Sequence, residues 1–287
     1  MPDPDVIEFS AGKPGYLGRK RLLIAGVAVA VIVVAGVLIG IKVGGTGAAA
    51  GHGNPAPGQL VAQVTGVPAG LAEAAGDGHG QVTAALTSVR GAPLVARGKP
   101  EVLYVGTEYC PYCAAQSWAV IVALSRFGTF SGLSTIRSGN YRPDPNLATW
   151  TFYGSAYSSR YLAFVPVETK SNVLTARTAN PQKGSSYTRL QTLTAAEQAV
   201  FNRYDQPGSV PFLDFGNRSV IVGSSFDPLV LQKLTWSQIA ASLRKPVSLA
   251  GWAILGAANY FTAAICQLTG DQPARACTPA VRKLLGP

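Results

Sequence analysis

The sequence predicts a mixed α/β domain that is carried on a single membrane-spanning helix. Three segments lead to this fold class: an apolar stretch at 22–41, a strand-to-helix junction with a Cys-x-x-Cys pair at 99–124, and two short strands around a Gly-Asn turn at 210–223. Only 13% of the 287 residues are charged, whereas a soluble domain carries roughly 25%. This composition favours a membrane or cell-envelope protein and excludes disorder of the whole chain.

Residues 22–41 contain no charged side chain, and twenty such residues in a helix span the roughly 30 Å hydrocarbon core of a bilayer. Basic residues precede this stretch, and only Lys42 follows it closely, which predicts a cytoplasmic N-terminus. We therefore expect a protein of the cell membrane with one span. Its parts are a cytoplasmic tail (1–21), a transmembrane anchor (22–42), a Gly/Ala/Pro-rich linker (43–58) and an extracytoplasmic domain (59–287). A cleaved signal peptide is the alternative for the N-terminal segment.

The candidate reactive group is Cys110-Pro111-Tyr112-Cys113. Residues 99–106 before it are a β-branched and aromatic run that predicts a strand, and the residues after it have apolar side chains at helical spacing. Free backbone N–H groups and the helix dipole stabilise a thiolate at such a position. We expect Cys110 to be the exposed nucleophile with a low pKa and Cys113 to be the buried resolving thiol. Pro111 suits the first position of a helix, where its missing N–H has no consequence.

A zinc half-site and a purely structural disulfide are the alternatives for this pair. Zinc usually takes four Cys or His ligands, but the only histidines, His52 and His79, precede Gly80. A four-residue disulfide loop gains little stability from closure. The sequence therefore predicts thiol–disulfide exchange at Cys110 and Cys113, with no metal and no cofactor.

Residues 210–223 begin with Val210-Pro211 and form a predicted β-hairpin. With the Cys-x-x-Cys helix before this hairpin, the sequence resembles the thioredoxin superfamily. The resemblance implies an elaborated thioredoxin-like fold, in which helices flank a central mixed sheet, with an inserted region and C-terminal helices. It also implies a cis Val210–Pro211 bond whose backbone receives the substrate beside Cys110. Tyr109, Pro111 and Tyr112 are further expected substrate contacts.

Longer stretches are similar to one membrane-tethered, thioredoxin-like family, named domain of unknown function 929. The segments that carry this similarity are KPEVLYVGTEYCPYCAAQSWAVIVALSRFGTFSGL, VPFLDFGNRSVIVG and ANYFTAAICQLTGDQPARAC. Cys-Pro-Tyr-Cys is also the glutaredoxin motif, which fits the superfamily without implying glutathione.

The region between the Cys-x-x-Cys helix and the predicted hairpin at 210–223 is expected to contain strands near 149–153 and 161–165. It is also expected to contain a helix that begins with a Thr194–Glu197 capping box. It either covers the active site or is a structural elaboration. A second capping box, Thr235-Trp236-Ser237-Gln238, predicts another helix. Residues 249–268 are either a second membrane span or, from their apolar stripe, a buried amphipathic helix.

The other two cysteines, Cys266 and Cys277, are expected to form a structural disulfide, because Cys110 and Cys113 pair with each other. A relay of electrons to or from Cys110 and Cys113 is the alternative. Glu108, two residues before the nucleophile, is either a surface side chain or a proton relay for Cys113.

These features predict a membrane-anchored extracytoplasmic thiol–disulfide oxidoreductase that acts on protein thiols and disulfides in oxidative folding or isomerisation. By analogy with the superfamily, a quinone-coupled disulfide oxidase of the membrane is its expected redox partner. Two alternatives stay open: a non-catalytic binding module with structural disulfides, and delivery of electrons or metal to another protein. Nucleic acid is not expected as a partner, because the basic residues are scattered despite a net charge of +10.

Overall fold

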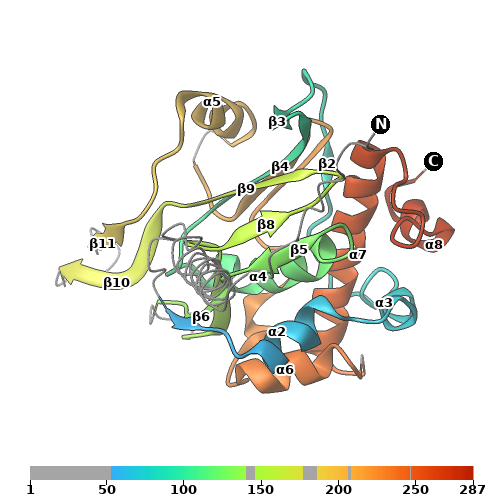
Figure 1. Ribbon diagram of the computed structural model, residues 1–287. Helices are drawn as coiled ribbons and strands as arrows, with labels where there is room; N and C mark the ends of the chain where they lie inside the picture. Colours follow the sequence, from blue (N-terminus) through green and yellow to red (C-terminus); the bar gives the residue numbers. More distant parts are fainter. Residues whose placement is uncertain (1–52, 140–145, 177–185, 206–207, 246, 287) are drawn as a thin grey trace, which may run out of the picture. The chain divides into compact units, whose positions relative to one another are not determined.

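The computed structural model describes residues 53–139, 146–176, 186–205, 208–245 and 247–286 (Figure 1). The predicted cytoplasmic tail, the membrane anchor and most of the predicted linker lie outside these residues. The described part of the chain is a mixed α/β structure.

A six-stranded mixed sheet is the centre of the fold. Its strands are β2 (Thr87–Ser88), β3 (Val95–Ala96), β4 (Lys99–Gly106), β9 (Ala163–Glu168), β12 (Phe212–Phe215) and β13 (Ser219–Val222). β4 pairs in parallel with β9 on one side and antiparallel with β12 on the other. β13 continues the sheet beyond β12 and pairs with β2, and β3 pairs with the start of β4. The predicted strand at 99–106 and the predicted hairpin are both confirmed.

The apolar run of β4 is explained by helices on both faces of the sheet. Val102 and Tyr104 belong to the larger core, with side chains of α4 (Pro111–Leu124) and α7 (Leu249–Thr269). Leu103 and Val105 belong to a smaller core on the other face, with side chains of α5 (Ala195–Tyr204). A strand buried on both faces does not alternate between polar and apolar residues.

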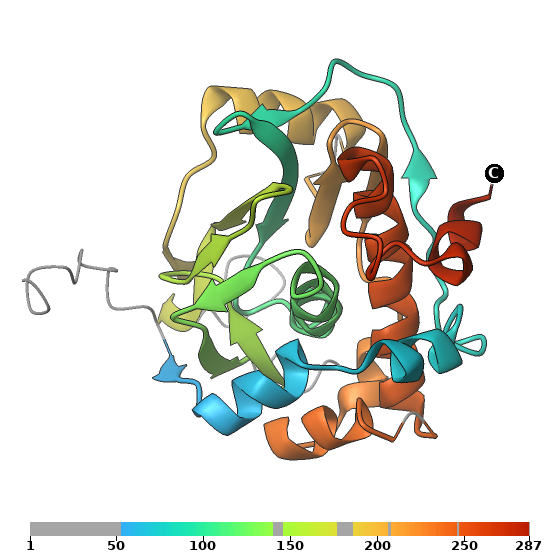
Figure 2. The ribbon, with the colours of Figure 1, turned by 45° about the vertical axis from the view of Figure 1, so that its right-hand side comes forward.

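The helix α7 packs against α4, and both views show the two helices side by side (Figures 1 and 2). By length and composition, α7 is the one helix of the described residues that could cross a membrane, but 83% of its apolar window is buried inside the protein. The predicted apolar stripe consists of Ile254, Ala258, Phe261, Ile265 and Leu268. The first four are buried, and Leu268 is half-buried. The interpretation of residues 249–268 as a buried helix is therefore the one that fits.

Shorter elements surround this core. The other helical segments are α2 (Gly58–Thr65), α3 (Ala69–Ala75), η2 (Pro228–Leu231), α6 (Trp236–Ser242), α8 (Pro279–Arg282) and η3 (Lys283–Leu285). Both predicted capping boxes are present, Thr194 with Glu197 at α5 and Thr235 with Gln238 at α6. In each, the threonine hydroxyl and the acidic or amide side chain satisfy backbone N–H groups that the first helical turn leaves unpaired.

Further short strands lie outside the central sheet, and β5 to β8 among them come from the long segment between α4 and β9. The strands outside the central sheet are β1 (Asn54–Pro55), β5 (Thr129–Ser131), β6 (Ser134–Arg137), β7 (Ala148–Thr151), β8 (Ala156–Ser158), β10 (Lys170–Ala176) and β11 (Ser186–Arg189). They form a β1–β6–β7 sheet and the pairs β5–β8 and β10–β11. β1 falls within the predicted linker 43–58, so the ordered structure begins earlier than the composition suggests, because β6 supplies a partner for Asn54 and Pro55.

The contact between α7 and the segment after α3 requires glycine at Gly256. A Cβ atom at this position would lie within 2.9 Å of three backbone atoms of Asp77 and Gly78. We expect Gly256→Ala to lower the free energy of unfolding by about 1–3 kcal/mol, because overpacking outweighs the gain in helix propensity. Urea denaturation measures this change.

Gly70→Ala in α3 is the matched control, because a Cβ atom there meets nothing within 4 Å. This control is expected to be neutral or slightly stabilising. Equal effects of the two substitutions would contradict the packing described for α7.

Candidate functional site

The Cys-x-x-Cys pair lies at the N-terminus of α4, directly after the central strand. Cys110 is the N-cap residue of this helix and Pro111 is in its first turn. The Cys110 Sγ atom accepts a hydrogen bond from the backbone N–H of Cys113 at 3.4 Å. An acceptor at this position satisfies an N–H group that the helix itself leaves unpaired, and it would do so more strongly as a thiolate.

Neither cysteine is in a disulfide, and both are buried: Cys110 is 7% exposed and Cys113 is 3% exposed. The sequence predicts an exposed Cys110, and this part of the prediction is wrong.

The Val210–Pro211 segment lies against Cys110, although the two are a hundred residues apart. The Cys110 thiol donates to the Val210 carbonyl oxygen at 3.6 Å. The Val210–Pro211 peptide bond is cis, the isomer that the resemblance implies. The Pro211 carbonyl accepts from the Gly223 N–H at 2.7 Å, which ties the proline to the end of the β12–β13 hairpin.

The two tyrosines of the motif have different surroundings. Tyr109 stacks on Tyr187 of β11, with ring centroids 4.0 Å apart and planes 3° from parallel. Tyr112 is 46% exposed. Pro111 is buried. Of the three motif residues predicted to contact substrate, Tyr112 is thus the one that is open to solvent.

Glu108 is buried and held by hydrogen bonds, so the surface interpretation of this residue is wrong. Its carboxylate accepts from the Thr151 hydroxyl at 2.7 Å and from the Asn172 backbone N–H at 3.3 Å. Its own N–H donates to the Lys170 carbonyl. Glu108 thereby joins the loop before α4 to β7 and β10, which are far from it in the sequence.

A second buried carboxyl, Glu168, was not identified from the sequence. It ends β9, where its strand partner is Gly106 of β4. Burial, and secondarily the negative charge of Glu108, raise the pKa of Glu168 to about 8. Its Oε2 atom is buried with no hydrogen-bond partner among the described residues. The only signal in the sequence was an acidic residue at the end of an apolar run.

Tyr104 completes the buried cluster behind the two cysteines. Its pKa is raised well above the ordinary value, first by burial and then by the charge of Glu168. Cys113 and Cys110 act on the Tyr104 pKa in the same direction. A Cβ atom at Gly106 would clash with the Tyr104 ring and hydroxyl, so glycine at this position leaves room for the tyrosine.

These surroundings keep Cys113 protonated. Burial raises the pKa of its thiol well above the usual value, and the hydrogen bond to Cys110, the charge of Cys110 and the charge of Glu168 act in the same direction. An acid–base partner with a pKa near neutrality is suited to moving the proton of such a thiol. Glu168 has a pKa of about 8, and its charge acts on the pKa of Cys113.

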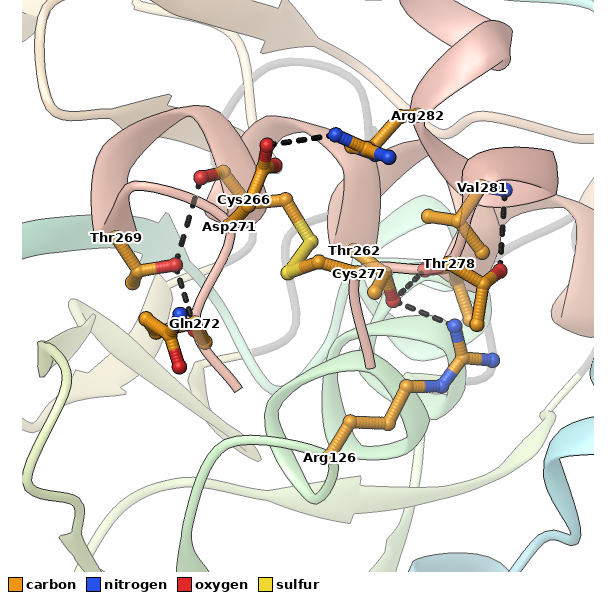
Figure 3. The surroundings of a disulfide bond; sticks show 11 residues. Arg126, Thr262, Cys266, Thr269, Asp271, Gln272, Cys277, Thr278, Val281 and Arg282 are labelled. Carbon is orange, nitrogen blue, oxygen red and sulfur yellow. Dashed lines mark hydrogen bonds and ion pairs between the residues drawn. A yellow bond between two sulfur atoms is a disulfide. The ribbon is translucent and has the colours of Figure 1, made fainter. Parts of the chain in front are cut away.

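The other two cysteines form a disulfide, Cys266–Cys277, with Cα atoms 5.6 Å apart (Figure 3). It joins the end of α7 to the C-terminal segment. Asp271 lies between them in sequence and forms an ion pair with Arg282 at 2.9 Å. The sulfur atoms and an Asp271 oxygen lie within 4.8 Å of one another. Since both sulfurs are used in the disulfide, this group fits a covalent crosslink and not a metal site.

The fold and the site together define a mixed α/β protein with a dithiol at a helix N-terminus, backed by buried protonatable groups. The chain belongs to the family described as Domain of unknown function (DUF929), which it matches over residues 85–267. This match includes both cysteines of the motif, Glu168 and the Val210–Pro211 segment. Neither the curated proteins nor the solved structures give a significant match.

The raised pKa of Glu168 predicts a pH-dependent stability. The unfolded chain loses this proton above pH 4.5, whereas the folded protein keeps it up to about pH 8. Stability is therefore lost progressively as the pH rises through this window. We expect Glu168→Gln to have a small effect at pH 5 and to stabilise the reduced protein by a few kcal/mol at pH 8, at about 1.4 kcal/mol per pKa unit.

Urea denaturation of the reduced protein at both pH values measures this difference. Glu73→Gln removes an exposed carboxylate and is the control, with the same small effect at pH 5 and pH 8. A Glu168→Gln effect that does not change between the two pH values would contradict the buried, protonated state of this carboxyl.

Proposed function

We propose that this protein is a thiol–disulfide oxidoreductase with a thioredoxin-like fold, anchored in the cell membrane with its catalytic domain on the extracytoplasmic side. One observation carries the proposal. The Cys110 thiol is the N-cap of α4, and it lies 3.6 Å from the carbonyl oxygen that precedes a cis-proline. A helix N-terminus favours the thiolate that such chemistry needs.

The order of the elements supports the thioredoxin-like assignment. β4, α4 and β9 form a βαβ unit with parallel strands, and β12, β13 and α7 follow as an antiparallel hairpin and a helix. The βαβ unit and the β12–β13 hairpin are joined into one sheet by the pairing of β4 with β12. The strands between α4 and β9 are then an insertion, which reaches the active-site loop through Glu108 and Tyr109.

In the oxidising direction, a substrate thiolate attacks Cys110 Sγ of a Cys110–Cys113 disulfide. The bond between the two cysteines breaks, a mixed disulfide forms, and Cys113 leaves with the electron pair and gains a proton. A second substrate thiolate attacks the substrate sulfur of the mixed disulfide, which releases Cys110 and forms the substrate disulfide. Two electrons pass from substrate to enzyme, and the described structure corresponds to the reduced product.

Glu168 is the proposed proton donor and acceptor for Cys113. When Cys113 leaves as a thiolate, a protonated Glu168 supplies the proton. When the reaction runs in reverse, an ionised Glu168 removes it so that Cys113 can attack the mixed disulfide. A carboxyl with a pKa of about 8 holds both forms in useful amounts near neutral pH. Glu108 contributes by raising this pKa through its charge, which replaces its predicted role as the relay itself.

The substrate is proposed to be a polypeptide in an extended conformation. Val210 is half-buried beside Cys110, and Tyr112, two residues after Cys110, offers an exposed aromatic ring. Hydrogen bonds from the backbone near Val210 to a substrate backbone would not depend on the substrate's side chains. The site therefore suits proteins of varied sequence.

The location and the redox partner rest on the sequence. The charge asymmetry around residues 22–41 favours a domain outside the cytoplasm. The Cys266–Cys277 disulfide is compatible with such an oxidising compartment. Reoxidation of the dithiol needs an acceptor of two electrons, and a quinone-coupled disulfide oxidase of the same membrane has this chemistry.

We expect Cys113→Ser to accumulate mixed disulfides between Cys110 and substrate proteins, because the resolving thiol is absent. Non-reducing electrophoresis of the full chain, after rapid acid quenching and alkylation, detects these adducts. The signal is expected to rise at least tenfold over wild type and to vanish on reduction.

The matched controls are Cys110→Ser and the double variant Cys110→Ser/Cys113→Ser, neither of which is expected to form adducts. If Cys113→Ser traps nothing and the wild type neither oxidises nor reduces a model dithiol peptide, the enzymatic proposal is wrong and a binding module is favoured.

A further inference from the structure

A cavity of about 220 Å³ lies away from the two reactive cysteines, beside the Cys266–Cys277 disulfide. Its walls come from α3, from the end of α4 and from the segment that follows α7. Val67, Ala72, Arg126, Arg275 and Val281 are among the residues that line it. The redox proposal assigns no role to this part of the molecule.

Arg126 is fixed in the wall of this cavity by two polar side chains of α7. One terminal nitrogen donates to the Thr262 hydroxyl at 2.6 Å and the other donates to the Asn259 side-chain oxygen at 3.0 Å. Figure 3 shows the Arg126 side chain reaching Thr262 next to Cys277 and Thr278. The guanidinium group is therefore preorganised before any ligand arrives.

The two residues that hold Arg126 are themselves held. The Asn259 side-chain NH₂ donates to the carbonyl oxygens of Ala72 and Gly76 at 2.7 and 2.8 Å, and the Thr262 hydroxyl donates to Ala258. Polar side chains in the middle of a buried helix lose stability unless they form hydrogen bonds. Here both orient one arginine.

The hydrogen-bonding capacity of Arg126 is only partly used. A guanidinium has five N–H donors, and two of them have partners among the described residues. Within this part of the chain no carboxylate lies within 4.0 Å of Arg126. Burial lowers its pKa to about 10, so the group is still a cation at neutral pH. A partly buried cation of this kind is stabilised by an anion.

The remaining lining indicates the kind of anion. Val67, Ala72 and Val281 offer apolar surface, while the exposed side chains of Arg275 and Glu73 lie at the rim. Two arginines against one glutamate give a net positive site, and Glu73 disfavours a second negative charge on the ligand. The volume is below the roughly 300–1,000 Å³ of sites for drug-sized molecules.

We propose that this cavity binds a small monocarboxylate, whose carboxylate accepts hydrogen bonds from the unused donors of Arg126 and whose apolar body packs on Val67, Ala72 and Val281. Arginine and a carboxylate form paired, charge-assisted hydrogen bonds, which makes this ligand a close match for the group. Arg275, Ala276 and Thr278 flank Cys277, so the disulfide holds this wall of the cavity in place. The inference does not depend on the proposed redox activity.

Sodium benzoate is the probe, titrated by calorimetry into the full chain in a non-ionic detergent, with neutral benzamide as its isostere. We expect saturable binding of benzoate, with a dissociation constant at least tenfold below that of benzamide. Arg126→Gln is expected to weaken benzoate binding at least tenfold. Inorganic phosphate, titrated in the same way, is expected to bind more weakly than benzoate.

A second variant keeps the test informative if Arg126→Gln fails to fold. Ala69→Phe places a large side chain at the exposed mouth of the cavity, and Ala74→Phe, on an exposed part of α3 outside the cavity lining, is its matched control. Ala69→Phe is expected to weaken benzoate binding at least tenfold and Ala74→Phe less than twofold. Absence of saturable benzoate binding, equal binding of benzamide, tighter binding of phosphate, or benzoate binding unaffected by Ala69→Phe would each overturn the proposal.

Discussion

The central position of β4 is the constraint on which the rest of the site depends. Its parallel pairing with β9 brings Glu168 beside Gly106, and its antiparallel pairing with β12 brings the Val210–Pro211 segment next to Cys110. The thiols, the Val210–Pro211 backbone and a buried carboxyl are thus all positioned by one strand. A shift of its register by one residue would exchange the two faces and separate Tyr104 from Cys113.

Burial around the thiols opposes ionisation, and this has consequences for both stability and chemistry. Cys113, Tyr104 and Glu168 all have raised pKa values because the protein excludes water from them. The buried Glu168 oxygen without a described partner lowers stability at high pH.

Local signals made much of this structure predictable from the sequence. Residues close together in the sequence determine the β4 strand, the start of α4 at Pro111 and the β12–β13 hairpin. The same holds for the two capping boxes. Glu168 could not be found in this way, because its partner strand lies some sixty residues earlier and parallel pairing leaves no local pattern. The burial of Cys110 and Glu108 likewise depends on Val210 and Thr151, which the chain brings in from a distance.

The central claim is that Cys110 and Cys113 interconvert reversibly between a dithiol and a disulfide, while Cys266–Cys277 persists. Equilibration of the full chain in glutathione buffers of graded potential, followed by alkylation and peptide mass analysis, measures both pairs at once. The account predicts a single two-electron transition at Cys110–Cys113, with a tenfold change in ratio per roughly 30 mV, at a potential above that of the other pair. Failure of Cys110 and Cys113 to form a disulfide at any potential would contradict it.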